Sequence, residues 1–420
     1  MEDNEDAELK DLNHREVGWK ALHWISSLAL LLLLPSISTV LSFADEHYLS
    51  VFAQYISASY SILEVLFLRF PDGDGVENRT SRGTAWFLMV LTCFTAFVGS
   101  LISGSKFFFL KNKWKSGERS LIVLHRILSM LCLLTGWVRI CLAVVALFGF
   151  CRDSHTGQCI AHGIMGTSFI LYGSLLSIVL VLPWLRNGTN QKNSQEFYDS
   201  IVITVWGFVN TWTEHRWGKE PWSHSDYQHT SMGIIWWSGG FLGVFLSKNN
   251  QRSFIPSVIL IFTGWAMSVH HQHLEISTKV HFFFGLSLMI AGLSRLIEIN
   301  FVLNNQRSIS NKILPFQYLP CFFLVESGLL FMGANEQQLE LVNSLHADHS
   351  AYIMVLSSGA FLIYFWVLLL LEIYLYLVGI DKLSGQDCSN GSYQRLDENS
   401  THTRNDIELE SFSDNEAGSV

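Results

Sequence analysis

The sequence predicts an all-α protein, a polytopic bundle of about ten transmembrane helices, with nine to eleven as the range. Of its 420 residues, 49% are hydrophobic and only 15% are charged, an imbalance that requires long apolar runs. Several runs exceed the roughly 18 apolar residues that mark a helix able to cross about 30 Å of hydrocarbon. Trp, Tyr, Lys or Arg residues stand near the ends of these runs, as is typical of membrane interfaces.

Eleven apolar stretches account for the expected spans. They are residues 21–43, 51–70, 84–103, 121–150, 160–184, 200–212, 230–246, 254–269, 280–303, 316–332 and 352–378. The runs 200–212 and 254–269 are short, so they require tilt or flanking polar residues inside the bundle. The first run ends at Ser42-Phe43-Ala44, a small-x-small pattern, so it is either a signal peptide or a signal anchor.

The two ends of the chain are acidic and contribute most of the net charge of −9. They contain too few large apolar residues to offset the entropy of ordering. We therefore expect a disordered leader over residues 1–20 and a disordered acidic tail over residues 381–420. Between them we expect N-terminal membrane segments over residues 21–120 and a main transmembrane domain over residues 121–380.

Basic residues in alternate loops predict the orientation, because Lys and Arg are retained on the cytoplasmic side. These residues are the five within 106–119, then Arg186 with Lys192, Lys248 with Arg252, Arg307 with Lys312, and Lys382. The tail is then cytoplasmic. We expect the protein in the endomembrane system (ER, Golgi or vacuole) or the plasma membrane.

The other loops then face the lumen or the cell exterior. There Cys151 and Cys159 flank the loop CRDSHTGQC, and a disulfide between them suits an oxidising compartment. Asn78-Arg79-Thr80 is a glycosylation acceptor on the same side.

Histidines also gather at this outer side, whereas the cytoplasmic side offers only His125 near a helix end. Imidazole binds zinc, copper or iron, so we interpret the outer histidines as candidate metal or haem ligands. The candidates are His162, His215, His224, His229, His270, His273, His281, His346 and His349. The pairs His270/His273 and His346/His349 have the i,i+3 spacing of one helical face. For any single histidine, a hydrogen bond at headgroup level is the alternative.

A few ionisable residues fall within apolar runs, where charge is costly. Arg139 lies deep enough to require a partner, and Glu64 and Glu326 are the obvious carboxylates in such runs. We expect a structural ion pair, with a proton or substrate path as the alternative. Glycines near residues 163–166 and 239–243 suit close helix packing.

Three stretches carry a family resemblance: CIAHGIMGTSFILYG, NTWTEHRWGKEPWSHSDYQHTSMGIIWW and GWAMSVHHQHLEISTKVHFFFGLSLMIAGLSRLIEI. With these motifs in this order, the chain resembles the Ytp-type family of fungal multi-pass membrane proteins over roughly residues 121–377. The resemblance implies membership of a family of undetermined activity, and it carries over no catalytic residues.

Several functions remain open. One is a haem- or metal-dependent membrane oxidoreductase with His162, His229 or His281 as ligands. Another is a zinc-dependent lipid hydrolase with Glu214 as the general base. A third is a transporter or a non-catalytic membrane protein that binds a metal or senses pH. The cofactor is open among haem, zinc, copper and none. The lipid bilayer is the expected partner, and no basic aromatic patch for nucleic acid is present.

Overall fold

Long helices make up almost all of the regular structure in the computed structural model of the chain. The structure describes residues 18–71, 76–107, 115–152, 155–187, 193–213, 215, 221–270, 274–304 and 313–380, and these residues contain no strand. The elements are η1 (Ala29–Leu33), α2 (Leu34–Phe43), α3 (His47–Phe67), α4 (Arg79–Phe107), α5 (Lys115–Phe148), α6 (Thr156–Val181), α7 (Pro183–Arg186), α8 (Gln195–Thr213), α9 (His224–Leu246), η3 (Lys248–Asn250), α10 (Ile255–Ser268), α11 (Glu275–Ile297), η4 (Glu298–Val302), η5 (Pro315–Gln317), α12 (Tyr318–Met332), α13 (Glu336–Ser344) and α14 (His349–Val378).

The prediction of an all-α bundle of spanning helices is confirmed. Each of the eleven apolar stretches coincides with a helix. Among the described residues, eight helices are long and apolar enough to cross a membrane, and Ile255–Ser268 is a shorter apolar helix. The count of eight lies somewhat below the ten expected, because α8, α9 and α10 are shorter or less apolar than the rest.

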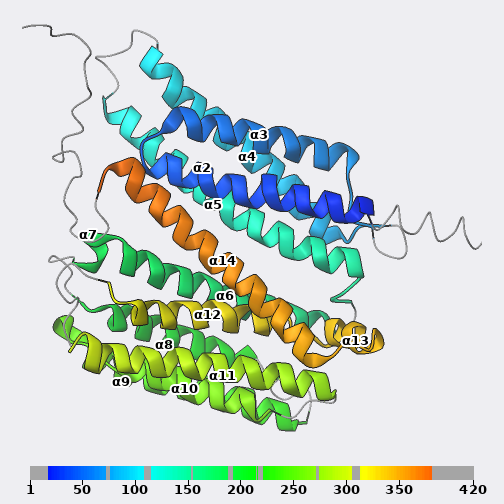
Figure 1. Cartoon of the computed structure of the whole chain (residues 1–420), viewed down its shortest axis with the longest axis vertical. Helices are drawn as coiled ribbons and strands as arrows, with labels where there is room; N and C mark the ends of the chain where they lie inside the picture. The colour runs from blue at the N-terminus through cyan, green and yellow to red at the C-terminus, as the bar shows by residue number, and fades with distance from the viewer. Residues whose placement is uncertain are drawn as a thin grey trace, which may run out of the picture.

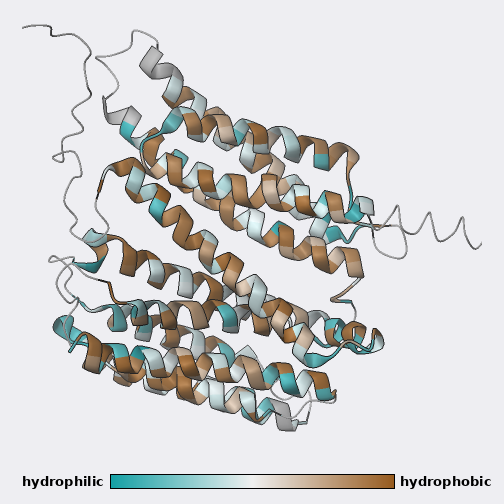
Figure 2. Cartoon of the chain, viewed as in Figure 1, coloured by the Kyte–Doolittle hydropathy of each residue, from teal (hydrophilic) through white to brown (hydrophobic). Residues whose placement is uncertain are grey.

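The long helices lie side by side, so that their ends form two opposite faces (Figure 1). We call these faces the α7 end and the α13 end, after the short helix at each. The helix that begins at Gly18 starts at the α13 end, and α14 finishes at the α7 end (Figure 1). Apolar residues cover the lengths of the helices, and hydrophilic residues gather at the two ends, as expected for a bundle in a bilayer (Figure 2).

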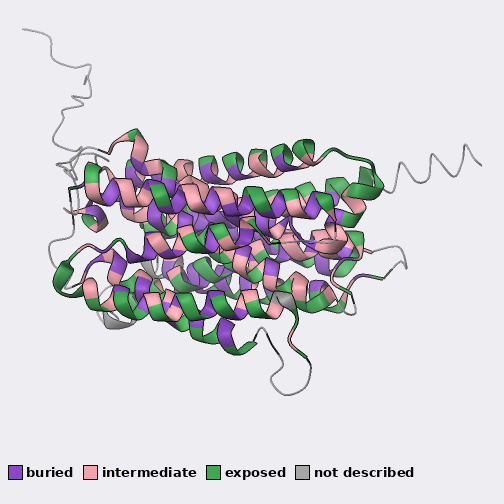
Figure 3. Ribbon diagram, turned by 90° about the horizontal axis from the view of Figure 1, so that it is seen from below, coloured by how far each residue is buried: buried purple, intermediate pink, exposed green. Residues whose placement is uncertain are grey.

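Two groups of helices build the bundle. Helices α2, α3, α4 and α5 pack together as an N-terminal unit, while α6 and α8–α12 form a second unit. Helix α14 runs obliquely between the two units and contacts α2, α6, α11 and α12 (Figure 1). The largest apolar core belongs to the second unit and centres on Phe284, Leu288, Leu324 and Val325. Buried residues line the helix faces that are turned toward one another (Figure 3).

A proline shapes the first helix, which extends over Gly18–Phe43. Pro35 lacks the N–H that would bond the carbonyl of Leu31, and η1 is a π-helical turn at this point. The Leu31 carbonyl faces Gly136 of α5, where an added Cβ would collide with it. The absence of a side chain at Gly136 therefore lets α5 pack directly against this turn.

Candidate functional site

Four of the predicted histidines come together at the α13 end. They are His162 on α6, His229 on α9, His270 after α10 and His281 on α11, and we call them the histidine cluster. The ring centroids of His162 and His281 lie 6.0 Å apart. The centroids of His281 and His270 are separated by 6.2 Å, and those of His270 and His229 by 5.4 Å. The four imidazoles therefore form a continuous chain across three helices and a loop.

Hydrogen bonds fix the same tautomer in three of these rings. Nδ1 of His162 lies 2.8 Å from the carbonyl of Gln158, and Nδ1 of His281 lies 2.9 Å from the carbonyl of Ser277. Because a carbonyl oxygen can only accept, each Nδ1 carries the proton, and Nε2 of the neutral ring bears the lone pair.

His270 reaches the same state through Gln228. The Gln228 amide nitrogen donates to the carbonyl of Ala266 at 2.6 Å, which leaves its oxygen facing Nδ1 of His270. Nδ1 of His270 is therefore also the donor. In metal-binding histidines, this kind of outer contact orients the ring and frees the other nitrogen for the metal.

The cluster is embedded in aromatic and polar packing. The His162 ring stacks on Phe331 at a centroid distance of 4.5 Å, and Phe331 contacts Phe284 at 4.6 Å. The Asn210 side chain donates to the carbonyl of His229 at 2.9 Å and so joins α8 to α9. His162 and His281 are both buried. These two rings therefore lie inside the bundle, while His229 and His270 are partly exposed.

The other predicted site residues either lie away from the histidine cluster or fall outside the described residues. His215 is buried, stacks on Trp222 and lies 3.2 Å from Asp226, the residue that forms a capping box with Ser223 at the start of α9. His224 is the first residue of α9. Glu214 and His273 lie outside the described residues.

His346 and His349 do not share a helical face, because His346 precedes α14 with a φ of 52° and is exposed. His349 opens α14 and lies 3.2 Å from Asp348, the N-cap residue. The hydroxyl and backbone N–H of Ser350 donate to Asp348, and these bonds hold the pKa of its carboxyl below the usual range. Asp348 therefore stays ionised and pairs with His349 when that histidine is protonated.

The loops at this end are tied together. Cys151 and Cys159 form a disulfide in the structure. The backbone N–H of Cys151 donates to Gln337 on α13 at 2.6 Å, which holds the disulfide loop against that helix. Asn78, the predicted glycosylation acceptor, caps α4 by accepting from the backbone N–H of Thr80 at 2.8 Å.

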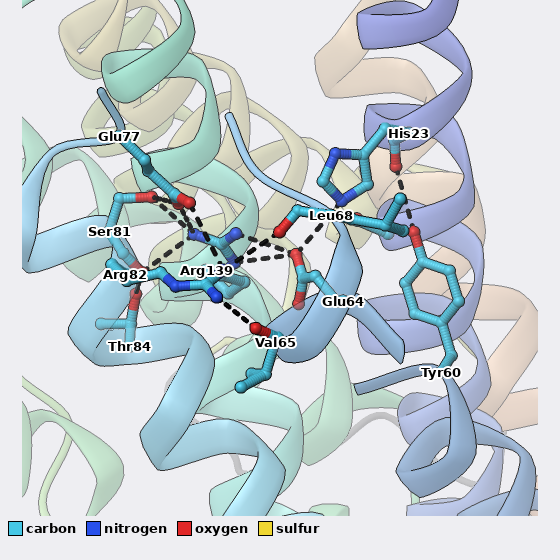
Figure 4. Close-up of polar contacts among 11 residues, drawn as sticks. His23, Tyr60, Glu64, Val65, Leu68, Glu77, Ser81, Arg82, Thr84 and Arg139 are labelled. Carbon is cyan, nitrogen blue, oxygen red and sulfur yellow. Dashed lines mark hydrogen bonds and ion pairs between the residues drawn. The ribbon is translucent and has the colours of Figure 1, made fainter. Parts of the chain in front are cut away.

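Arg139, for which the sequence requires a partner, has two carboxylate partners (Figure 4). Its guanidinium contacts Glu64 at 2.8 Å and Glu77 at 2.9 Å, and all three side chains are buried. His23 lies 3.5 Å from the same oxygen of Glu64. Glu77 and His23 were not recognised from the sequence, because Glu77 lies in a loop and His23 near the end of a span. The expected pair is therefore part of a larger buried charge network at the α13 end.

A second charge network lies at the α7 end. Arg295 contacts Glu298, three residues later in the chain, at 2.6 Å, and also Glu196 on α8 at 3.1 Å. Arg252 contacts the same oxygen of Glu196 at 3.1 Å. A cavity of about 60 Å³ lies beside these side chains. The network fixes the N-terminal end of α8. Its ion pairs stabilise the polar first turn of α8, which precedes the short apolar run at residues 200–212.

Among the described residues, no three His, Cys, Asp or Glu side chains are grouped closely enough to hold one metal ion. The histidine cluster instead supplies neighbouring pairs of rings. Any ion bound with three or more ligands requires movement of a ring or a ligand from outside these residues.

Comparison with known proteins decides the family. Residues 135–375 match the family described as Protein YTP1-like, C-terminal. Over 389 residues the chain is 56% identical to Protein YTP1 of Saccharomyces cerevisiae, an alignment that covers 91% of this chain and 84% of that protein. The chain belongs to the YTP1-like family. This confirms the resemblance found in the sequence motifs.

More distant relatives place this YTP1-like chain among membrane proteins. An uncharacterized membrane protein of Schizosaccharomyces pombe is 25% identical over 279 residues, 56% of this chain and 54% of that protein. One from Saccharomyces cerevisiae is 28% identical over 174 residues, 35% of this chain and 27% of that protein. No solved structure matches the chain. Together with its apolar helices, these likenesses establish an integral membrane protein in contact with the lipid bilayer.

Proposed function

We propose that this YTP1-like protein binds a transition-metal ion, copper or zinc, through the histidine cluster at the α13 end. The observation that carries the proposal is the shared tautomer of His162, His270 and His281, in which Nδ1 is held by a fixed acceptor. Neutral imidazole that carries its proton on Nδ1 binds these metals through the lone pair of Nε2.

The ring separations suit two ligands to one ion. Two imidazoles bound to the same ion hold their centroids about 5 to 6 Å apart, since each metal–nitrogen bond is about 2.0 Å long. The three neighbouring separations of 5.4, 6.0 and 6.2 Å fall close to this range. The predicted candidate His273 follows His270 by three residues in the sequence and stays a candidate ligand outside the described residues. These features support binding of a small ion by residues of α6, α9, α11 and the loop after α10.

A haem fits the cluster less well. The His162 and His281 rings meet edge to face, with an interplanar angle of 88°, and His162 is stacked on Phe331. A porphyrin with two axial histidines requires its own plane to lie between the rings, so α6 and α11 would have to separate. His125 does not supply a second haem site either, because both of its ring nitrogens contact side chains, Ser42 at 3.0 Å and Gln54 at 3.0 Å.

Orientation is part of the proposal. The described basic residues at loops of the α7 end, Arg186, Lys248 and Arg252, favour the cytoplasm for that face. The α13 end, with the disulfide, Asn78 and the histidine cluster, then faces the lumen of the endomembrane system or the cell exterior, and the tail is cytoplasmic. A disulfide at the α13 end agrees with an oxidising compartment.

Elemental analysis and an absorption spectrum of detergent-purified protein test the metal proposal. The comparison is between the wild type and the double variant His229→Ala, His281→Ala. His155→Ala is the matched control, because His155 lies at the same end but contacts Glu336 at 3.5 Å, outside the cluster. We expect stoichiometric copper or zinc in the wild type and the control, and loss of the metal in the double variant.

Other results would redirect the assignment. A Soret band that disappears in the double variant would replace the metal ion by haem. Neither metal nor haem in the wild type, after growth with added copper and zinc, would overturn the proposal. Bound zinc with hydrolysis of a lipid ester or amide would favour the hydrolase alternative with Glu214 as its base, while reversible reduction of bound copper would favour the oxidoreductase.

A further inference from the structure

One face of α3 is polar and buried along its whole length. The residues on this face are His47, Ser50, Gln54, Ser57, Ser61 and Glu64, and each is shielded from solvent. Their spacing alternates between three and four residues, which places them on one side of a helix. We call this row the α3 polar stripe. It faces α2 and α4 inside the N-terminal unit and contacts His125 and Arg139 of α5. Uncompensated polar groups at such a place in a membrane protein are costly.

At the α7 end, the stripe begins with a connected set of polar groups, two of which are histidines. Nε2 of His125 lies 3.0 Å from Gln54, and the Gln54 amide donates to Ser129 at 3.0 Å. The ring of His47 is 6.0 Å from that of His125. His47 also lies 3.5 Å from Asp45, a largely exposed carboxylate that pairs with Arg126. Asp45 therefore links the aqueous surface to the buried histidines.

In the middle of the bundle, hydroxyl groups continue the row. Ser61 and Thr92 of α4 share a hydrogen bond of 3.0 Å. The hydroxyl of Ser57 is fully buried and has no hydrogen-bond partner in the described part of the chain. Successive positions on one helix face are about 5 to 6 Å apart, a distance that one water molecule bridges.

At the α13 end, the stripe finishes at Glu64. One carboxylate oxygen binds Arg139, while Oε2 has no hydrogen-bond partner among the described residues. His23 and Arg139 contact this carboxyl group, Glu77 contacts Arg139 from its other side, and Arg82 lies 3.7 Å from Glu77 (Figure 4). A titratable group thus stands at each end of the stripe, with hydroxyl groups between.

We propose that the α3 polar stripe is a path for protons through the N-terminal unit, between Asp45 and His47 at the α7 end and Glu64 at the α13 end. A proton that enters binds the lone pair of a histidine, a hydroxyl group or a bridging water molecule, and that group releases another proton to the next acceptor. Bridging water carries the proton past the Gln54 amide, and the Glu64 carboxylate takes up the last proton and releases it to water at the α13 end. Each step breaks one O–H or N–H bond and forms another, so no oxidant or reductant is needed. This path involves none of the histidine cluster and is independent of the metal proposal.

Substitution of Ser57 distinguishes a proton path from a purely structural role of the α3 polar stripe. Its hydroxyl makes no hydrogen bond with the described residues, so removing it is expected to leave the fold as stable or more stable. If the stripe served packing alone, a small apolar residue would serve equally well. In a proton path, an apolar side chain at the midpoint breaks the row.

Proton flux into liposomes tests the proposal. Purified full-length protein is reconstituted with a trapped pH-sensitive dye, and a potassium gradient with valinomycin drives proton entry. The variants are Ser57→Val and Glu64→Gln, with Ser57→Ala as a second variant in case valine does not fit. Ser168→Val is the matched control, because Ser168 is exposed on α6, outside the N-terminal unit.

We expect the wild type and Ser168→Val to conduct protons well above protein-free liposomes. We expect flux at least tenfold lower in Ser57→Val and Glu64→Gln, with unchanged elution on size-exclusion chromatography and unchanged metal content. Wild-type flux equal to that of empty liposomes would overturn the proposal. So would undiminished flux in Ser57→Val and Ser57→Ala, or flux that follows sodium instead of protons.

Discussion

At the residue scale, a few buried charged residues contribute strongly to the stability of this bundle. Arg139 is fully buried and satisfies two carboxylates from different segments, Glu64 of α3 and Glu77 of the loop before α4. Its guanidinium also lies over the ring of Phe70, at 5.1 Å from the centroid. Removing this cation takes the nearest compensating charge from two buried carboxylates and leaves, among the described residues, only His23, at 3.5 Å from Glu64, and Arg82, at 3.7 Å from Glu77. Such a loss costs far more than loss of an exposed pair.

We therefore predict that Arg139→Met lowers the free energy of unfolding by about 3–5 kcal/mol, measured by denaturant titration in detergent micelles. Arg126→Met on the same helix is the control, because its partner Asp45 is 69% exposed and the pair contributes about 1 kcal/mol or less. Adding Glu64→Gln and Glu77→Gln to Arg139→Met should recover at least half of the loss. A triple variant no more stable than Arg139→Met would contradict this role for charge pairing.

At the element scale, close approach between helices depends on small residues at particular positions. A Cβ added at Gly166 of α6 would lie 2.6 Å from the carbonyl of Gly328 on α12, too close for any real contact. One turn earlier, a Cβ at Gly163 would meet no atom within 4 Å. Both glycines were recognised from the sequence as packing residues, but only Gly166 lies at the interface.

The two glycines make a matched pair of variants. We predict that Gly166→Ala destabilises the protein and lowers its thermal unfolding midpoint, because α6 and α12 must move apart. Gly163→Ala should leave the midpoint unchanged or raise it, since alanine favours helix over glycine by about 1 kcal/mol. The measurement is tryptophan fluorescence during heating in detergent, and equal midpoints for the two variants would refute the packing argument.

Sequence periodicity and hydropathy predicted the helices well, because a membrane span depends on local composition. The starts of spans were predicted less well. Helix α3 begins at His47, before the apolar run at residue 51, so the ring contact between His47 and His125 was not foreseen. The prediction that His125 is the only histidine on its side of the bundle is therefore wrong. The cluster members were each named as candidates, but their grouping follows from tertiary packing of four separate segments. Spacing such as that of His346 and His349 carries no information about such contacts.

At the scale of the whole molecule, the first helix is an integral part of the bundle. Its residue Ser38 exchanges hydrogen bonds with Ser50 of α3 at 2.9 to 3.1 Å, and His23 approaches Glu64 at 3.5 Å. Loss of this helix by cleavage after residue 44 would expose the α3 polar stripe to lipid. We therefore expect a retained signal anchor, with the start of the first helix and the end of α14 on opposite sides of the membrane.

Tags at both ends of the full chain test this arrangement in sealed microsomes. We predict that one polypeptide carries both tags, that added protease removes the C-terminal tag, and that the N-terminal tag is protected until detergent is added. Asn78→Gln should abolish any shift in mobility caused by an endoglycosidase, because Asn78 lies at the α13 end. An N-terminal tag on a short separate fragment would mean that the first helix is cleaved. A protected C-terminal tag would reverse the orientation and place the histidine cluster on the cytoplasmic side, where the disulfide would not persist.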